Sequence, residues 1–252
     1  MKTDPTMSST KVPEVTLVFW IIKIAATTLG ETGGDAVSMS MNLGYLLATV
    51  IFAVIFLIAV AAQIRSRKFY PFLYWVTIIA TTTVGTTLAD FADRSLGIGY
   101  AGGASLLLAL LVASLAVWHR SEGNIAVSTV ATPKVEMFYW VTIMFSQTLG
   151  TALGDWTADS AGLGYVGSAV LFLGLLAAVA AAYFWTRISR TALFWTAFVL
   201  TRPLGAVVGD FFDKPHAEGG LALSRYTASG VLLVFIAACI LSFKQRPASQ
   251  RH

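Results

Sequence analysis

Four aspartates recur at one fixed place in a repeated pattern, and carboxylates in such a setting can bind cations or carry protons. Each follows a tryptophan by fifteen residues, and a glycine stands five residues before it. The four copies read Phe19-Trp20…Gly30…Asp35, Tyr74-Trp75…Gly85…Asp90, Tyr139-Trp140…Gly150…Asp155 and Phe194-Trp195…Gly205…Asp210. Every copy lies in a strongly apolar stretch, where an ionisable residue is costly and usually functional. The pattern therefore nominates the aspartates as site residues.

Each aspartate ends a polar stripe on a predicted helix. The residues three, seven, eleven and fifteen positions after the tryptophan are spaced four apart, so they share one helical face. Besides the aspartates, the polar members of the stripes are Lys23, Thr27, Glu31, Thr82, Thr86, Gln147, Thr151 and Arg202. Four such stripes can converge on a common axis or cavity. We expect substrate selection at the members that break the repeat, which are Lys23, Glu31, Gln147 and Arg202.

The chemistry of the stripes indicates a hard cation. Neighbouring carboxylates repel, so they need a compensating cation or partial protonation. Oxygen ligands without His or Cys suit magnesium, calcium or manganese better than zinc or copper. The predicted ion- or substrate-binding residues are Glu31, Asp35, Asp90, Asp155, Asp210, Thr86, Thr151 and Gln147, with the four aspartates as metal ligands. Lys23 and Arg202 are the predicted charge partners of vacant carboxylates.

Structural roles compete with each of these assignments. A tryptophan beside Phe or Tyr at the start of a span is typical of an interfacial belt, and a repeated glycine is typical of close helix packing. The aspartates could equally be solvated at the outer rim, or could hold the bundle together through pairs with Lys23 or Arg202. A second acidic set follows in the loops at Asp93, Asp159 and Asp213. We interpret this set as solvated turn residues, with a vestibule that gathers cations as the alternative.

The composition predicts that the helices carrying these stripes lie in a membrane. The chain is 56% hydrophobic and 12% charged, whereas a soluble domain carries about 25% charged residues. Apolar runs long enough to cross a bilayer recur throughout. We predict an all-α polytopic membrane protein with about eight transmembrane helices, at 15–36, 43–64, 70–92, 97–118, 136–157, 162–185, 191–212 and 221–243. One cysteine and three scattered histidines give no support to a disulfide framework or a zinc site.

Positive charge predicts the orientation. The tails and the loops after even-numbered helices hold twelve Lys and Arg residues, against three in the loops after odd-numbered helices. Both termini are therefore expected in the cytoplasm. Because every repeat enters from the same side, the four two-helix repeats are parallel. Helix geometry places each aspartate roughly 22 Å beyond its tryptophan, in the outer half of the bilayer.

The spacing of the tryptophans predicts two halves. Successive tryptophans are 55, 65 and 55 residues apart, so the longer middle interval separates two pairs of repeats. The predicted organisation is a cytoplasmic tail at 1–14, a membrane half with repeats 1 and 2 at 15–118, a cytoplasmic linker at 119–135, a membrane half with repeats 3 and 4 at 136–243 and a cytoplasmic tail at 244–252.

The fourfold Trp/Gly/Asp frame, which covers residues 15–243, resembles a family of bacterial integral membrane proteins built from four tandem two-helix repeats. The resemblance implies eight spans and a place in the bacterial cytoplasmic (inner) membrane. The family is one of unknown function, so the resemblance implies no substrate. The function has to be inferred from the residues.

The preferred function is a secondary transporter that exports a hard divalent cation in exchange for protons through the four aspartates. Its expected partners are the lipid bilayer, a small inorganic cation and protons; no nucleic acid, no cofactor and no enzymatic activity are expected. A homo-oligomer and a non-transporting role as a sensor or assembly partner stay open.

Two alternatives remain. Asp90-x-x-Asp93 and Asp210-x-x-Asp213 are similar to the paired motifs with which membrane prenyltransferases hold magnesium and diphosphate. An intramembrane metal-dependent enzyme is therefore one alternative, although the charge bias places these motifs away from the cytoplasm. A permease for a small organic anion, with Arg202 and Lys23 as counter-charges, is the other.

Overall fold

The computed structural model describes residues 10–248, and this part of the chain forms eight long α-helices. They are α1 (Leu17–Asp35), α2 (Gly44–Arg65), α3 (Pro71–Asp90), α4 (Tyr100–Glu122), α5 (Pro133–Asp155), α6 (Gly164–Trp185), α7 (Arg190–Asp213) and α8 (Arg225–Ser242). Every helix end lies within four residues of its predicted position, and the all-α class is confirmed. Residues 1–9 and 249–252 of the predicted tails lie outside the described residues.

Local sequence signals explain where the odd-numbered helices begin. Thr16, Thr132 and Ser189 each accept a hydrogen bond from the backbone N–H three residues further on, which caps α1, α5 and α7. Pro71 and Pro133 stand in the first turn of α3 and α5, where the missing N–H has no helical partner to lose. The starts of the four helices that carry the polar stripes are thus fixed locally.

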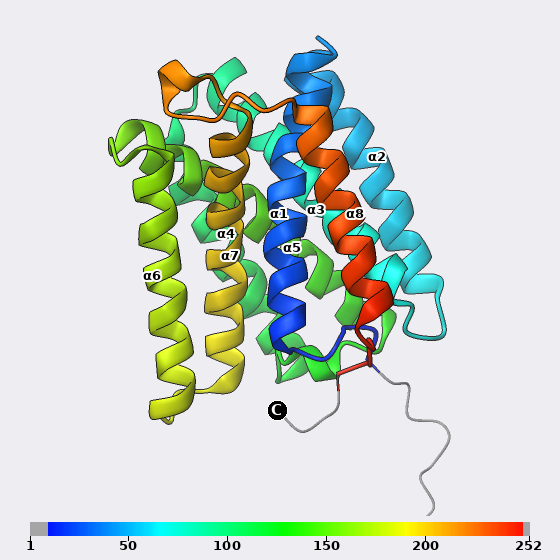
Figure 1. The fold of residues 1–252 in the computed structure, drawn as a ribbon. Helices are drawn as coiled ribbons and strands as arrows, with labels where there is room; N and C mark the ends of the chain where they lie inside the picture. Colours follow the sequence, from blue (N-terminus) through cyan, green and yellow to red (C-terminus); the bar gives the residue numbers. More distant parts are fainter. Residues whose placement is uncertain (1–9, 249–252) are drawn as a thin grey trace, which may run out of the picture.

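The eight helices run side by side along one axis (Figure 1), and their contacts arrange them in an inner ring and an outer layer. Helices α1, α3, α5 and α7 form a closed inner ring, in which each packs on the next and α7 returns to α1. Each outer helix packs chiefly on the inner helix of the following repeat, so that α2 lies on α3, α4 on α5, α6 on α7 and α8 on α1. The repeats therefore interlock in a cycle, because no single hairpin can bury its own apolar surface.

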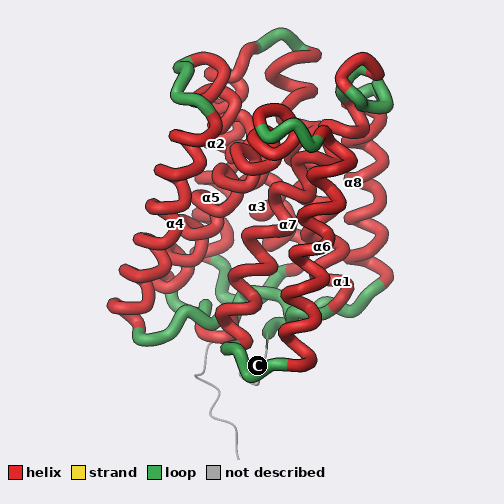
Figure 2. The backbone as a smooth tube through the Cα atoms, turned by 90° about the vertical axis from the view of Figure 1, so that its left-hand side faces the viewer, coloured by secondary structure: helices red, strands yellow, loops and turns green. Residues whose placement is uncertain are grey.

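The outer layer indicates a membrane protein. All loops gather at the two ends of the bundle (Figure 2), and the outer helices bury only 11–17% of their most apolar windows. Within the described residues, six helices are long and apolar enough to cross a membrane. The other two, α1 and α5, each carry three charged residues and lie in the inner ring, shielded by the outer helices. The finer count of eight spans stays a prediction.

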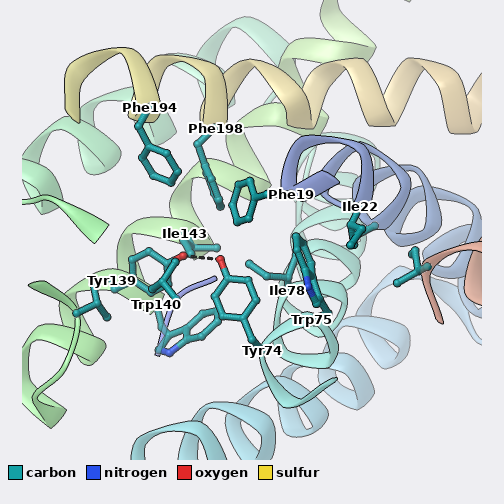
Figure 3. Packing of buried hydrophobic residues seen from close by; sticks show 14 of the residues in the cluster. Phe19, Ile22, Tyr74, Trp75, Ile78, Tyr139, Trp140, Ile143, Phe194 and Phe198 are labelled. Atoms are coloured by element: carbon teal, nitrogen blue, oxygen red, sulfur yellow. Dashed lines mark hydrogen bonds between the residues drawn. The ribbon is translucent and has the colours of Figure 1, made fainter. Parts of the chain in front are cut away.

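The aromatic residues of the repeats form a layer across one end of the ring, here named the tryptophan end. Each residue before a tryptophan contacts the tryptophan of the next repeat, with ring centroids 5.4 Å apart for Phe19–Trp75, 5.8 Å for Tyr74–Trp140, 6.1 Å for Tyr139–Trp195 and 5.7 Å for Phe194–Trp20. Figure 3 shows Tyr74 and Tyr139 pointing toward each other, and their hydroxyls are 2.6 Å apart. Trp75, Trp140 and Trp195 are at most 4% exposed. Their interpretation as an interfacial belt is wrong, because the neighbouring repeat covers them.

Three further segments lie across the tryptophan end: residues 10–16, 124–132 and 244–248. The backbone of Lys11 donates to Val130 and that of Ala248 donates to Val12, at 3.1 and 2.8 Å. The ammonium of Lys11 is 2.6 Å from the Glu136 carboxylate at the start of α5. The predicted linker between the halves is therefore, in part, a cover over the aromatic layer.

The repeated glycines are contact points between neighbouring inner helices. A Cβ atom built on any of them would lie no more than 3.1 Å from the residue seven positions after the next tryptophan. The pairs are Gly30 with Thr82, Gly85 with Gln147, Gly150 with Arg202 and Gly205 with Thr27. The packing interpretation of these glycines is confirmed. Because each glycine has no side chain, a polar-stripe residue of the next repeat can contact the helix backbone there directly.

Candidate functional site

The polar stripes meet inside the inner ring, and Arg202 of α7 lies at the meeting point. Its Nη2 atom is 3.0 Å from Oε2 of Glu31 on α1. The same nitrogen donates to the hydroxyls of Thr86 on α3 and Thr151 on α5. One guanidinium thus joins all four inner helices, and its side chain is fully buried. Arg202 is therefore the partner of Glu31, not of an aspartate.

Several buried polar atoms in the same layer have no partner among the described residues. They are both amide atoms of Gln147, the hydroxyl of Thr82, and Nε and Nη1 of Arg202. Buried polar groups are nearly always hydrogen-bonded to protein, water or a ligand. These atoms are therefore available to a ligand or to water inside the ring.

Lys23 lies nearer the tryptophan end and is also fully buried. Its ammonium is 4.2 Å from the centroid of the Phe198 ring and 3.4 Å from the hydroxyl of Thr201. No carboxylate of the described residues lies within 4.0 Å of it. The structure thus does not pair Lys23 with the carboxylates that sequence reasoning assigned to it.

The four repeated aspartates lie together at the other end of the ring, here named the aspartate end. All four are at most 3% exposed, so the interpretation as solvated rim residues is wrong. Three of them, Asp35, Asp90 and Asp155, are the last residues of their α-helices, and each is followed by one π-helical turn. Such turns occur frequently at functional sites, because they widen the helix and redirect its side chains.

The carboxylates form two groups of three, and Asp35 belongs to both. The first carboxylate group is Glu31, Asp35 and Asp90, and the second carboxylate group is Asp35, Asp210 and Asp213. In each group the three residues contribute oxygens that lie within 4.8 Å of one another. Carboxylate oxygens so arranged are suited to a hard divalent cation. Asp155 lies outside both groups.

Two bases join the aspartates across neighbouring repeats. The ammonium of Lys214 is 2.7 Å from Asp35 and 3.1 Å from Asp210. The guanidinium of Arg94 is 2.9 Å from the carboxylate of Asp90 and 3.8 Å from that of Asp155, the aspartate of the third repeat. Each base therefore bonds the aspartate of its own repeat and that of the following one. The aspartates are consequently divided into two pairs, and each pair has its own counter-ion.

The repeats themselves identify the family. The model of a repeat described as Repeat of Unknown Function (DUF347) matches the chain four times, at residues 18–69, 73–124, 138–189 and 193–245. The chain belongs to the DUF347 family. Each match covers one inner helix and the outer helix after it, so the predicted repeat unit and the resemblance are confirmed. Neither a curated protein nor a solved structure matches the chain.

The four DUF347 repeats are not chemically equivalent. Only the second and fourth continue from the aspartate as Asp-Phe-x-Asp followed by a base, in Asp90-Phe-Ala-Asp93-Arg94 and Asp210-Phe-Phe-Asp213-Lys214. A base four residues after an aspartate lies beside it on a helix. This shared motif was the signal for both bridging bases, Arg94 and Lys214, which the sequence analysis counted only among the three basic residues in the loops after odd-numbered helices.

The three aspartates of the second acidic set, Asp93, Asp159 and Asp213, differ in how far they are buried. Asp213 is 7% exposed, and its carboxylate accepts a hydrogen bond of 3.0 Å from Arg225. The interpretation as a solvated turn residue is therefore wrong for Asp213. Asp159 is exposed and fits that interpretation, whereas Asp93 is half-buried.

Lys214 is charged at any physiological pH. It is the first residue after α7, at the aspartate end of the bundle. Burial by itself lowers the pKa of the ammonium, but the carboxylates of Asp210 and Asp35 outweigh this and hold the pKa well above its usual value. A permanent positive charge therefore lies within the second carboxylate group.

Proposed function

We propose that this DUF347 protein is a secondary transporter of the bacterial cytoplasmic membrane that exports a hard divalent cation, of the manganese, magnesium or calcium type, in exchange for protons. The observation that carries the proposal is that the buried carboxylate of Asp35 belongs to two groups of carboxylates. Closely spaced carboxylates bind a divalent cation when ionised and take up protons when the cation leaves. Exchange between the two is the elementary step of such a transporter.

The proposal includes eight spans, with both termini and the tryptophan end in the cytoplasm. The excess of Lys and Arg in the tails and in the loops after even-numbered helices supports this orientation. The inner position of α1 and α5 supports their membrane location, because the outer helices separate their polar stripes from lipid. In this orientation the aromatic layer blocks the cytoplasmic side, and the carboxylate groups lie toward the outside.

The test is cation flux into proteoliposomes, measured for Mn²⁺, Mg²⁺ and Ca²⁺ under a pH gradient. We expect Asp35→Asn to abolish the flux, because both groups lose a ligand. Asp159→Asn is the matched control, since this aspartate is exposed at the same end, and it should leave the flux unchanged. The proposal is wrong if the wild-type protein moves none of the three ions.

A small organic anion is the second candidate substrate. It is favoured by the unpartnered nitrogens of Arg202 and the unpartnered amide of Gln147 inside the ring. It is disfavoured by Glu31, which already neutralises the guanidinium. An organic anion flux in the same liposomes, carried without any of the three metal ions and lost in Arg202→Gln, would favour this substrate.

We propose no enzymatic activity. The excess of Lys and Arg in the tails and in the loops after even-numbered helices places the two Asp-x-x-Asp motifs on the side away from the cytoplasm, which disfavours an enzyme that draws on cytoplasmic magnesium and isoprenoid. Prenyl transfer by the purified protein would support the enzymatic alternative instead.

A further inference from the structure

The ammonium of Lys214 lies where a cation would bind in the second carboxylate group. Its Nζ atom is 2.7 Å from Oδ2 of Asp35 and 3.1 Å from Oδ1 of Asp210. The third carboxylate, that of Asp213, is nine-tenths buried, and its Oδ1 atom accepts no hydrogen bond from the described residues. A divalent cation bound by the same oxygens would need them about 2.0–2.6 Å away. The ammonium and such a cation cannot occupy the site together.

The first carboxylate group shares Asp35 with the second group, and Lys214 reaches it only through this aspartate. The bases on its other two carboxylates, Arg202 on Glu31 and Arg94 on Asp90, are guanidinium groups with further partners. Arg202 is fully buried and is also bonded to two threonine hydroxyls on the facing helices. Arginine forms rigid, planar contacts, whereas lysine is a point charge on a flexible stem. Exchange is therefore favoured at Lys214.

The backbone around Lys214 is held in place, so its side chain is the part that can move. The residue follows the end of α7 in an extended conformation. The loop after it folds back, and the N–H of Ala222 donates to the Lys214 carbonyl at 2.9 Å. A Cβ atom on Gly220 would collide with the same carbonyl, so the glycine allows this close approach. The ammonium is carried by four methylene groups, and rotation about their bonds is the movement that leaving the site requires.

We propose that Lys214 is a tethered counter-ion, which occupies the cation site between Asp35 and Asp210 in the ion-free protein and leaves it when a divalent cation binds. This inference rests on the proposed transport function. In the ion-free state, Lys214 and Arg225 face the three carboxylates of the group. When all three carboxylates are ionised, a divalent ion in place of the ammonium adds one positive charge and makes the site neutral, whereas a monovalent ion adds none. The tethered lysine thereby selects for divalent cations.

The first test is Mn²⁺ binding by calorimetry, with the detergent-solubilised full chain at pH 8. Lys214→Gln removes the competing charge, so we expect it to bind Mn²⁺ at least about tenfold more tightly than the wild type. Lys214→Arg keeps the charge and should not gain affinity. Lys134→Gln, at a base that is 66% exposed near the tryptophan end, should behave as the wild type.

The outcomes separate this inference from the transport function. Mn²⁺ binding that Lys214→Gln leaves unchanged or weakens would overturn the role of Lys214 while leaving the transporter in place. Absence of Mn²⁺, Mg²⁺ and Ca²⁺ binding in the wild type and in every variant would overturn both.

A second test needs no substitution. Lys214 is 6% exposed, so acetic anhydride should modify it slowly in the ion-free wild-type protein. Saturation with Mn²⁺ should release the ammonium and raise its acetylation severalfold, as measured by peptide mass spectrometry. The exposed amine of Lys134 serves as the internal standard. If Mn²⁺ binds and acetylation of Lys214 stays the same or falls, the displacement is wrong.

Discussion

At the scale of single residues, burial decides what each charged group can do. Arg202 and Glu31 are both buried in the middle of the ring, and each is the other's counter-ion. The spacing of four residues predicted that they face the same axis. Their pairing was not predictable, because it depends on the order of the helices around the ring and on the length of the arginine side chain.

The pair predicts a large non-additive effect on stability. Arg202→Gln leaves the Glu31 carboxylate buried without a counter-charge, which should cost about 3–5 kcal/mol. The double variant Glu31→Gln with Arg202→Gln removes both charges and should recover most of that loss. Thermal unfolding of the purified protein in detergent measures both values. A loss in the double variant equal to the sum of the losses in Arg202→Gln and Glu31→Gln would show that the two residues act independently.

At the scale of helices, the sequence predicted the bounds of the helices well, but it predicted poorly which residues of neighbouring helices contact one another. The Trp/Gly/Asp frame predicted eight helices and the packing role of the glycines, since both follow from local spacing. The aromatic layer was missed because a buried aromatic cluster and an interfacial belt have the same composition. Only the cyclic contact of Phe19 with Trp75, and of its counterparts in the other repeats, distinguishes the two.

The contacts between inner helices predict a marked difference between two glycines. Gly150→Ala places a methyl group into the Arg202 side chain and should destabilise the protein by about 1–3 kcal/mol. Gly174→Ala, on outer helix α6 with no neighbour within 4 Å, should be neutral or stabilising, because alanine favours the helix. Thermal unfolding in the same detergent compares them. Similar losses in both variants would contradict the account of the repeated glycines.

At the scale of the whole molecule, the closed ring brings repeats 4 and 1, which are far apart in the sequence, side by side. The Arg94 bridge lies between repeats 2 and 3, and the Lys214 bridge lies between repeats 4 and 1. Both bridges therefore join the two predicted halves at the aspartate end, while the hydroxyls of Tyr74 and Tyr139 join them at the tryptophan end. The division into two halves, which the tryptophan spacing indicates, stays a prediction. The bridges were missed because they require the ring to be closed.

The orientation of the whole bundle gives a prediction of its own. Ser160 and Ser121 are exposed at the aspartate end and the tryptophan end, respectively. A membrane-impermeant maleimide should label Ser160→Cys in cells with a permeabilised outer membrane, and should label Ser121→Cys only after lysis. Each cysteine is introduced with Cys239→Ala, which removes the only native thiol. The reverse labelling pattern would place the termini outside the cytoplasm.

The most direct measurement of the central claim records cation and proton movement together in proteoliposomes, with a Mn²⁺ indicator and a pH indicator inside. An inward Mn²⁺ gradient should drive Mn²⁺ in and protons out in the wild type, and neither movement should occur with Asp35→Asn, because this residue belongs to both carboxylate groups. Mn²⁺ entry without proton movement, or coupled exchange that survives Asp35→Asn, would contradict exchange at these carboxylates.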